Sequence, residues 1–457
     1  MKIKLSGSDP VFLIMIGAVI LAAGSVSPAS PPAQGSQDRA AWYREAKFGM
    51  FIHWGPYSLA SVEASWPIMR PQAGTITEAE YRELPKRFDP VRFDPASWVR
   101  LAKAAGQRYM VFTSKHHDGF CMFDSAFTEY KITRTPYGKD ILAQLADACR
   151  AEGMPLGFYY SPPDLNHPGF RDSSKLAREN WRGEPARPEW PLYLDYMELQ
   201  LTELLTRYGN VATLWFDGLR NQETYNGRRY HKLIRELQPS TLINNRIGLA
   251  GDYATPEQFI PNTIPQKGSN RQLSGTQQPK EAAAGSVPQN ADDFQLWETC
   301  MTINGTWAYN ANDRRFKTAT QLVRTLVEVA SKGGNFLLNV GPTPEGTIQP
   351  EFEERLLEIG RWLRVNGDSI YGTTYGPLQD IPFGKMTAKG KTLFLHVFDW
   401  PASGKLEIAG LEGRVSAARL LKGGERVGFD QAGGRLTLQV PPQAPDSHVS
   451  VIAIETR

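Results

Sequence analysis

Asp217 is the residue whose place in the sequence says most about chemistry. Val211–Phe216 is a short run of apolar, β-branched and aromatic residues, which predicts a buried strand. Asp217 follows it directly, just before Gly218. A carboxylate at the C-terminal end of a buried parallel strand faces the usual catalytic mouth of an α/β barrel, where it could act as a nucleophile. The alternative is a turn or helix-capping Asp, the commoner role for an isolated Asp-Gly pair.

Polar side chains also follow the other apolar runs of the chain. Together they would place His, Tyr, Asp, Asn, Arg and Glu on one rim, which is how a barrel assembles a polar pocket. The residues at the predicted strand ends are His53, His116, His117, Asp118, Tyr159, Tyr160, Asp217, Asn244, Asn245, Arg246 and Glu298.

We expect no metal and no organic cofactor at this rim. His116 and His117 are adjacent, and neighbouring residues of a strand point to opposite faces, so both would not easily bind one ion. No Cys or His spacing is typical of zinc, and no nucleotide, flavin or phosphate-loop pattern occurs. One structural and one site histidine is the simpler reading.

Two carboxyl groups at this rim would suit the hydrolysis of a glycoside with retention of configuration. That reaction needs a carboxylate nucleophile and a carboxylic acid about 5–5.5 Å apart. Asp217 is the predicted nucleophile, and either Glu257 or Glu298 could be the acid. Glu257 could instead be a solvated loop residue, and Glu298 could be a buried carboxylate paired with Arg246.

The elements that position these residues alternate between strand and helix. This alternation predicts a parallel sheet, and the length favours a (β/α)8-like (TIM-type) barrel of the α/β class over a doubly wound open sheet. The seven apolar runs leave one of eight strands missing or the barrel irregular. The predicted strands are Phe48–Trp54, Tyr109–Ser114, Pro155–Tyr160, Val211–Phe216, Thr241–Asn245, Phe294–Trp297 and Asn335–Val340. The predicted helices are Pro95–Ala105, Lys139–Glu152, Leu192–Tyr208, Arg228–Leu237, Thr318–Ser331 and Pro350–Asn366.

Two long polar segments and a change of pattern complete the organisation. Pro162–Pro191 and Gly251–Asn290 are predicted loops that overhang the catalytic face. After Tyr371, short alternating segments separated by Gly, Pro and Asp predict an antiparallel β-sandwich. We therefore expect a catalytic domain at residues 41–375 and a β-sandwich domain at 376–457.

The first residues have the pattern of a secretion signal. Lys2 and Lys4 precede the apolar stretch Val11–Ala23, which is short for a transmembrane helix. We expect a signal peptide over residues 1–29, a disordered leader over 30–40, and a secreted or periplasmic protein without membrane attachment after cleavage. The net charge of +3 is small for 457 residues and predicts no nucleic-acid partner.

Four segments resemble the α-L-fucosidases of glycoside hydrolase family 29. They are Phe48–Gly55, Lys115–Phe120, Trp215–Gly218 and Gly333–Pro342, and the similarity runs from about Trp42 to Tyr371. The resemblance implies a (β/α)8-like barrel followed by a β-sandwich, and a covalent fucosyl-enzyme intermediate. The implied substrate is a fucosylated oligosaccharide or glycoconjugate.

The resemblance also implies roles for single residues. Asp217 becomes the nucleophile, and Thr255-Pro256-Glu257 resembles the acid/base segment of members active on branched α-1,3/4-fucosides. Glu298 resembles the acid proposed for other members, and we favour Glu257, on a loop that could close over the leaving group. The implied substrate contacts are His53, Trp66, His116, His117, Tyr159, Trp215 and Arg246.

One position departs from the family pattern. The family often has Glu-Trp-Tyr after the first strand, and here Ser65 precedes Trp66. A hydroxyl contact is thus lost or supplied by Glu63. Phe51 and Trp297 are the expected neighbours of the sugar methyl. A fucose-binding protein without catalysis and a retaining glycosidase acting on α-L-galactosides are the alternatives.

Overall fold

The computed structural model describes residues 38–69, 76–218, 222–268, 274–275, 288 and 291–457. Arg39–Arg457 forms one compact unit, and the unit before it is Met1–Asp38. The predicted signal peptide and most of the predicted leader therefore lie outside the described residues.

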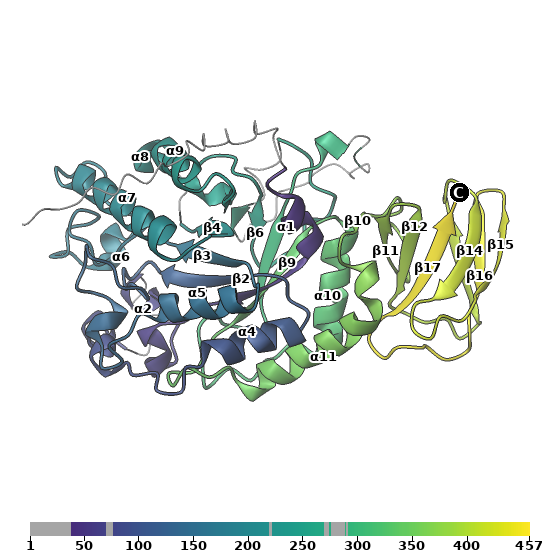
Figure 1. Cartoon of the computed structure of the whole chain (residues 1–457), viewed down its shortest axis with the longest axis horizontal. Helices are drawn as coiled ribbons and strands as arrows, with labels where there is room; N and C mark the ends of the chain where they lie inside the picture. The colour runs from purple at the N-terminus through teal and green to yellow at the C-terminus, as the bar shows by residue number, and fades with distance from the viewer. Residues whose placement is uncertain (1–37, 70–75, 219–221, 269–273, 276–287, 289–290) are drawn as a thin grey trace, which may run out of the picture. The chain divides into compact units, whose positions relative to one another are not determined.

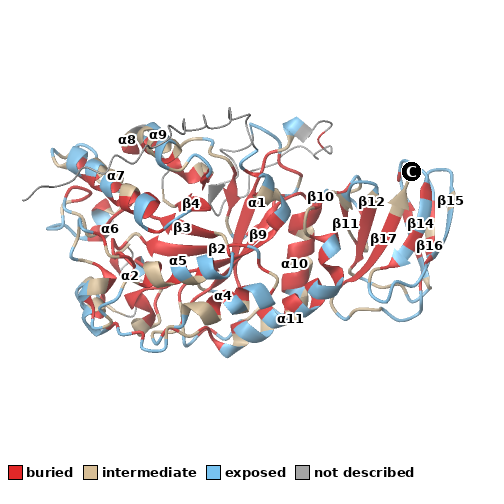
Figure 2. Ribbon diagram, in the orientation of Figure 1, coloured by how far each residue is buried: buried red, intermediate tan, exposed pale blue. Residues whose placement is uncertain are grey.

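A curled parallel sheet carries the catalytic half of the chain. Within the described residues it has seven strands, in the order β5-β4-β3-β2-β1-β9-β8, so most neighbours in the sheet are also neighbours in sequence. Every residue of these strands is buried, because helices cover the outside and side chains fill the inside (Figure 2). The strands are β1 (Phe48–Ile52), β2 (Met110–Lys115), β3 (Leu156–Tyr160), β4 (Thr213–Phe216), β5 (Leu242–Ile243), β8 (Glu298–Thr302) and β9 (Asn335–Val340).

The extended segment Tyr253–Glu257 bridges the two edges of this sheet. Tyr253 forms a parallel bridge with Asn244, beside β5, and Glu257 forms one with Cys300 of β8. The segment contains β6 (Thr255–Pro256), which also pairs with β7 (Ser274–Gly275). The ring is thus completed by an irregular eighth strand, and the α/β barrel prediction is confirmed.

This finding corrects two predictions. Glu257 was expected on a loop, but it lies at the C-terminal end of a strand-like segment, on the same rim as Asp217. The strand expected at Phe294–Trp297 is wrong, because β8 starts at Glu298, where the apolar run ends. β8 has the sequence ETCMT, and its polar side chains are buried. No apolar run therefore marks this strand in the sequence.

The helices follow the predicted ranges closely, and caps explain where several begin. Asp94 and Asp140 accept hydrogen bonds from the amides of Ser97 and Ala143, and Thr318 forms a capping box. Helix α4 packs against both α5 and α11 outside the sheet (Figure 1). The helices are α1 (Ala41–Ala46), α2 (Trp66–Met69), α3 (Glu78–Glu83), α4 (Pro95–Ala104), α5 (Ile141–Ala151), α6 (Ala177–Asn180), α7 (Trp190–Arg207), α8 (Gln222–Tyr225), α9 (Gly227–Leu237), α10 (Ala319–Ser331) and α11 (Pro350–Asn366).

The C-terminal strands form two antiparallel sheets around their own apolar cluster, as a β-sandwich requires. The larger sheet has the order β10-β11-β12-β17-β14 and the smaller β13-β16-β15. The predicted sandwich is confirmed, and the boundary at residue 375 stays a prediction. The strands are β10 (Thr374–Tyr375), β11 (Gly384–Lys389), β12 (Thr392–Val397), β13 (Lys405–Ala409), β14 (Val415–Leu420), β15 (Gly428–Ala432), β16 (Arg435–Gln439) and β17 (Ser450–Thr456).

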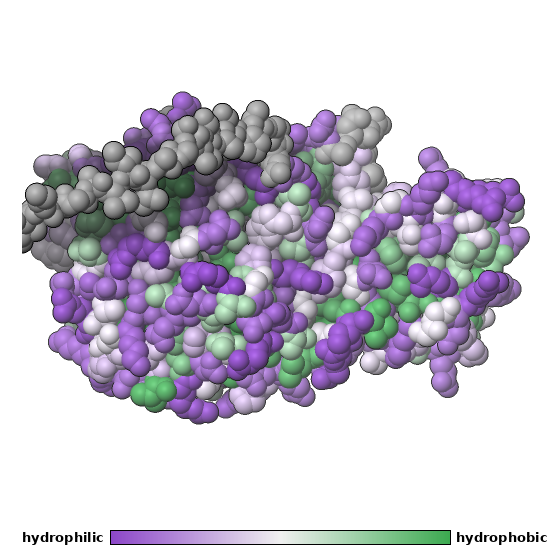
Figure 3. All heavy atoms as spheres, viewed as in Figure 1, coloured by the Kyte–Doolittle hydropathy of each residue, from purple (hydrophilic) through white to green (hydrophobic). Residues whose placement is uncertain are grey.

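The face of the molecule drawn in Figure 3 is mostly hydrophilic, with apolar side chains in separate groups. Among the helices of the described residues, none combines the length and the apolar character needed to cross a membrane.

Candidate active site

Asp217 lies directly after β4, where the strand-end argument places it. Its Oδ2 accepts a hydrogen bond of 2.8 Å from the Tyr159 hydroxyl, and its Oδ1 accepts one of 2.7 Å from Arg246 Nη1. The backbone amide of Gly218 also donates to Oδ1. Gly218 has a φ of +81°, and an added Cβ would lie 2.8 Å from Pro163, so the turn that presents Asp217 needs glycine.

Arg246 joins Asp217 to Glu257. The same Nη1 that donates to Asp217 donates to Glu257 Oε2 at 3.0 Å, while Nε and Nη2 of the guanidinium are held by Thr255. The two carboxylates therefore lie at most two hydrogen-bond lengths apart. The limit holds for Asp217 Oδ1 and Glu257 Oε2, the two oxygens that share Nη1, and it is compatible with the spacing of about 5–5.5 Å between the carboxyl groups of a retaining pair.

The surroundings of Asp217 keep its carboxylate ionised. Burial by itself raises the pKa of Asp217, but the charge of Arg246 and the hydrogen bonds from Arg246 and Tyr159 lower it, and a positive charge on His117 would act in the same direction. The pKa of Asp217 is therefore lowered below its usual value. A lowered pKa is what a carboxylate nucleophile needs at neutral and mildly acidic pH.

Trp215 forms a platform beneath these groups. The Tyr159 ring stacks on its indole with centroids 5.6 Å apart and an interplanar angle of 17°, and the Arg246 guanidinium carbon lies 4.5 Å from a ring centroid. Phe51 packs against the same indole at 5.2 Å. Both side chains that hydrogen-bond Asp217 thus rest on one aromatic surface.

His53 is a neutral imidazole in a defined tautomer. The Asn339 amide donates through Nδ2 to the Trp307 carbonyl at 2.7 Å, so its Oδ1 accepts from His53 Nδ1 at 2.7 Å. Burial lowers the pKa of His53 to about 4. Its Nε2 therefore carries a lone pair and can accept a hydrogen bond from a sugar hydroxyl.

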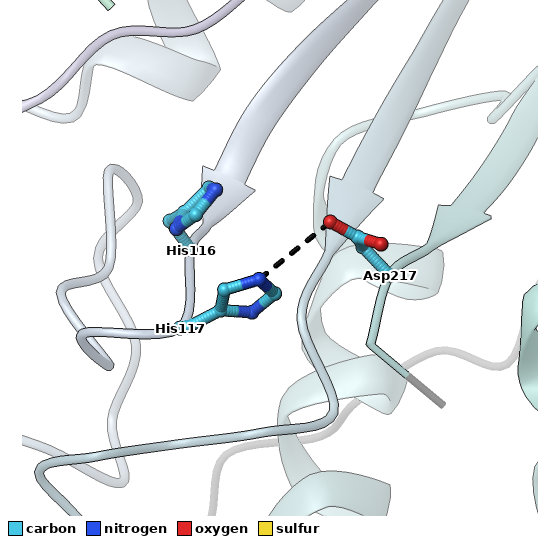
Figure 4. Close-up of side chains that lie close together, drawn as sticks. All are labelled: His116, His117 and Asp217. Atoms are coloured by element: carbon cyan, nitrogen blue, oxygen red, sulfur yellow. Dashed lines mark ion pairs between the residues drawn. The ribbon is translucent and has the colours of Figure 1, made fainter. Parts of the chain in front are cut away.

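His117 is fixed in the same way by Ser161. The Ser161 hydroxyl donates to the Pro163 carbonyl at 2.6 Å, so it accepts from His117 Nδ1 at 2.5 Å. His117 Nε2 then points at Asp217 Oδ2, 3.6 Å away (Figure 4). Burial lowers the pKa of His117, which keeps this imidazole neutral as well.

His116 and His117 lie closer together than expected. Their ring centroids are 4.3 Å apart, because both residues follow the end of β2 at Lys115 and the strand alternation no longer separates them. His116, His117 and Asp217 each offer a ligand atom within 4.8 Å of the others, so these three side chains could hold a metal ion (Figure 4). The expectation that strand alternation would separate the two histidines is therefore wrong.

Ser65, at the position where the family pattern often has glutamate, lies beside His116. The buried Ser65 hydroxyl lies 2.8 Å from His116 Nδ1, and its amide hydrogen-bonds the Tyr81 hydroxyl. Glu63 accepts the backbone amides of Trp307 and Ala308 at 2.7 and 3.0 Å. Glu63 thus anchors the segment that carries Trp307.

Two residues of this pocket, Trp307 and Asn339, were not predicted from the sequence. Trp307, rather than Trp297, lies against His53 at 5.0 Å and Phe51 at 6.0 Å, whereas the Trp297 indole donates to the Lys332 carbonyl. Asn339 lies within the Gly-Gly-Asn run used for the resemblance, near the end of β9, so its strand-end position was the available signal. No sequence signal marks Trp307. Trp66 lies in α2 and keeps 37% of its surface exposed.

Glu298 lies apart from the other predicted rim residues. It starts β8 rather than ending a strand, and it is fully buried, whereas the side chains of Asp217 and Glu257 are 22% and 20% exposed. Its carboxylate accepts hydrogen bonds from Tyr43, Tyr109 and Trp215. Glu257 is thus accessible to solvent, whereas Glu298 is buried and held by these three aromatic side chains.

Comparisons with known proteins place the chain in a family. A family profile described as alpha-L-fucosidase matches residues 22–368. The chain belongs to the α-L-fucosidases. It is therefore a glycoside hydrolase, of glycoside hydrolase family 29.

Named relatives agree with this assignment. Plasma alpha-L-fucosidase of Rattus norvegicus is 31% identical over 388 residues, covering 80% of this chain and 79% of the relative. Alpha-L-fucosidase isoenzyme 1 of Paenibacillus thiaminolyticus has 38% identity and a TM-score of 0.80, with 92% of this chain and 99% of that chain covered. The GH29 alpha-L-fucosidase of Bacteroides thetaiotaomicron, solved as a covalent intermediate with 2-fluoro-fucosyl fluoride, has 26% identity, a TM-score of 0.78, and coverage of 94% and 98%.

Proposed function

We propose that this enzyme is a retaining exo-α-L-fucosidase in which Asp217 is the nucleophile and Glu257 the acid/base. The observation that carries the proposal is the single Arg246 Nη1 that donates to both carboxylates. This contact holds the two groups close together, as a double displacement requires. The covalent intermediate of the Bacteroides relative supports the same two-step course.

In the first step, an Asp217 oxygen attacks the anomeric carbon of fucose. The bond from that carbon to the glycosidic oxygen breaks, and Glu257 gives its proton to the departing oxygen. In the second step, Glu257 takes a proton from water, the water oxygen bonds to the anomeric carbon, and the Asp217 ester bond breaks. Fucose leaves with its configuration retained.

The fucose hydroxyls would meet the lone pairs of His53 and His117, and the methyl group would meet Phe51 and Trp307. The Thr255-Pro256-Glu257 segment supports branched α-1,3/4-fucosides of oligosaccharides or glycoconjugates as substrates.

The basic and apolar pattern of the first 29 residues, together with plasma relatives, supports a secreted or periplasmic enzyme.

Trapping with 2-fluoro-fucosyl fluoride, followed by peptide mapping, tests the nucleophile. We expect the label on Asp217, and a label on another residue, or none on folded enzyme, would overturn the proposal. The same reagent separates turnover from the alternative of fucose binding without catalysis. An aryl α-L-galactoside measured beside the fucoside tests the other alternative, which the apolar contacts at the methyl position disfavour.

Comparing Glu257→Ala with Glu298→Gln tests the acid/base. Loss of a general acid typically costs about 10²–10⁴-fold, and the cost falls on substrates with poor leaving groups. We expect Glu257→Ala to lose that factor on a branched fucoside and to form fucosyl azide when azide is added to an activated aryl fucoside. Full activity of Glu257→Ala on the branched fucoside would refute the assignment.

A further inference from the structure

Glu298 is a buried carboxyl group that the proposed mechanism does not use. Its Oε2 accepts hydrogen bonds from the hydroxyls of Tyr43, at 2.7 Å, and Tyr109, and its Oε1 accepts one of 3.0 Å from Trp215 Nε1. Burial raises the pKa of Glu298 to about 7. Removing such a group from water is unfavourable, so its three donors must be aligned for it to be tolerated.

The Trp215 indole links Glu298 to the reacting carboxylate. Glu298 holds the N–H edge of the indole from the barrel interior, and the face of the indole supports Tyr159 and Arg246. Both of these side chains then hydrogen-bond Asp217, at 2.8 and 2.7 Å. A tilt of the indole would therefore move both partners of Asp217 at once.

We propose that Glu298 is a positioning residue that orients the nucleophile Asp217 through Trp215, and that it neither donates nor accepts a proton in the reaction. The inference rests on the proposed role of Asp217. The full burial of Glu298 keeps it from contact with substrate. Its contacts form one continuous path to Asp217 through Trp215, Tyr159 and Arg246. Glu298, in the interior of the barrel, thereby sets the orientation of Asp217 at the rim.

The test compares Glu298→Gln with Glu298→Met in the full chain. Glutamine keeps an acceptor for Trp215 Nε1, and methionine fills a similar volume without one. The measured quantity is the rate constant for labelling by 2-fluoro-fucosyl fluoride, because fluoride leaves without a general acid and the rate reports attack by Asp217 alone. A misplacement of about 1 Å can cost about 10²-fold, so we expect Glu298→Met to label about tenfold to a hundredfold more slowly.

Two controls separate positioning from loss of fold. Tyr43→Phe removes a donor on the side of the carboxylate away from Trp215, and it should lower thermal stability without changing the labelling rate. If Glu298→Met does not fold, Tyr43→Phe/Tyr109→Phe/Glu298→Met removes the phenol donors together with their acceptor. Replacing both partners by apolar groups is far less costly than leaving buried donors unpaired.

Each outcome decides the question. Slow labelling by the methionine variant, with near-normal labelling by Glu298→Gln, supports positioning through the acceptor. A folded methionine variant that labels at the wild-type rate overturns the inference. Formation of fucosyl azide by Glu298→Met overturns it in favour of an acid/base role. Absence of label on Asp217 in the wild-type enzyme refutes the proposed function instead, whatever the Glu298 variants do.

Discussion

Replacing Arg246 with methionine should move the acidic limb of the pH–activity profile upward. Arg246 Nη1 lies 2.7 Å from Asp217 Oδ1 and 3.0 Å from Glu257 Oε2, and its side chain is 5% exposed. Solvent therefore does little to screen this cation from Asp217. Arg246→Met removes the positive charge and leaves an apolar side chain that can remain against Trp215.

The size of the shift follows from the balance at Asp217. Burial acts to raise the pKa of Asp217, and Arg246 is the strongest influence that lowers it, ahead of His117 and Tyr159. An adjacent arginine lowers the pKa of an aspartate by about 1–3 units, equivalent to about 1.4–4 kcal/mol. Only the ionised carboxylate attacks. Activity should therefore be lost at a pH about one to three units higher in the variant than in the wild type.

The assay is kcat/KM against pH with an activated aryl fucoside, whose leaving group does not need protonation by Glu257. Arg246→Lys is the matched control, because it keeps a positive charge beside Asp217 while losing the planar fork of donors. We expect the lysine variant to be slower but to retain the wild-type acidic limb. An unchanged limb in Arg246→Met, or equal shifts in both variants, would refute the electrostatic reasoning.

Two further changes test the supports of the site. Asn339→Ala should lower kcat/KM by about tenfold to a hundredfold. His53 would lose the acceptor that fixes its tautomer, and the Trp307 carbonyl would lose a donor. A variant with the wild-type kcat/KM would contradict the tautomer assignment. Lys115→Met should lower the free energy of unfolding in urea by about 3–5 kcal/mol, because Asp164, with a side chain 1% exposed, loses its 3.0 Å ion pair. Lys115→Met/Asp164→Asn should recover part of that loss, because asparagine carries no charge and keeps an oxygen for the amides of Asn166 and His167. A single variant as stable as the wild type would show that the pair contributes little.

Periodicity was enough to predict most of the barrel. The apolar runs that became β1, β2, β3, β4 and β9 are buried on both faces, so they appear in the sequence as continuous apolar stretches. The helices have amphipathic stripes and capping residues, which mark their ends. Asp217, His53 and Arg246 followed from the rule that polar groups at the C-terminal ends of parallel strands share one rim.

The remaining elements depend on contacts that local sequence does not encode. Tyr253–Glu257 is extended because β5 and β8 offer it backbone partners, and nothing in its own composition separates it from the predicted loop. β8 is polar in sequence because its side chains hydrogen-bond inside the barrel. β15 is mostly exposed at the edge of its sheet, so it lacks the alternation of buried and exposed residues that β13 and β16 show. Trp307 enters the pocket only because Glu63 and Asn339 hold its backbone.

The irregular eighth strand allows the chain after Glu257 to change in length without affecting the rest of the barrel. Glu257 is carried by a short segment attached to its neighbours through isolated bridges, and a long stretch of chain follows it before β8. Insertions or deletions in that stretch would leave the register of β1 to β5 unchanged, so the proposed sugar-binding residues His53, His117 and Arg246 would keep their positions. Related enzymes can therefore differ in which glycan they accept and still recognise the same terminal sugar.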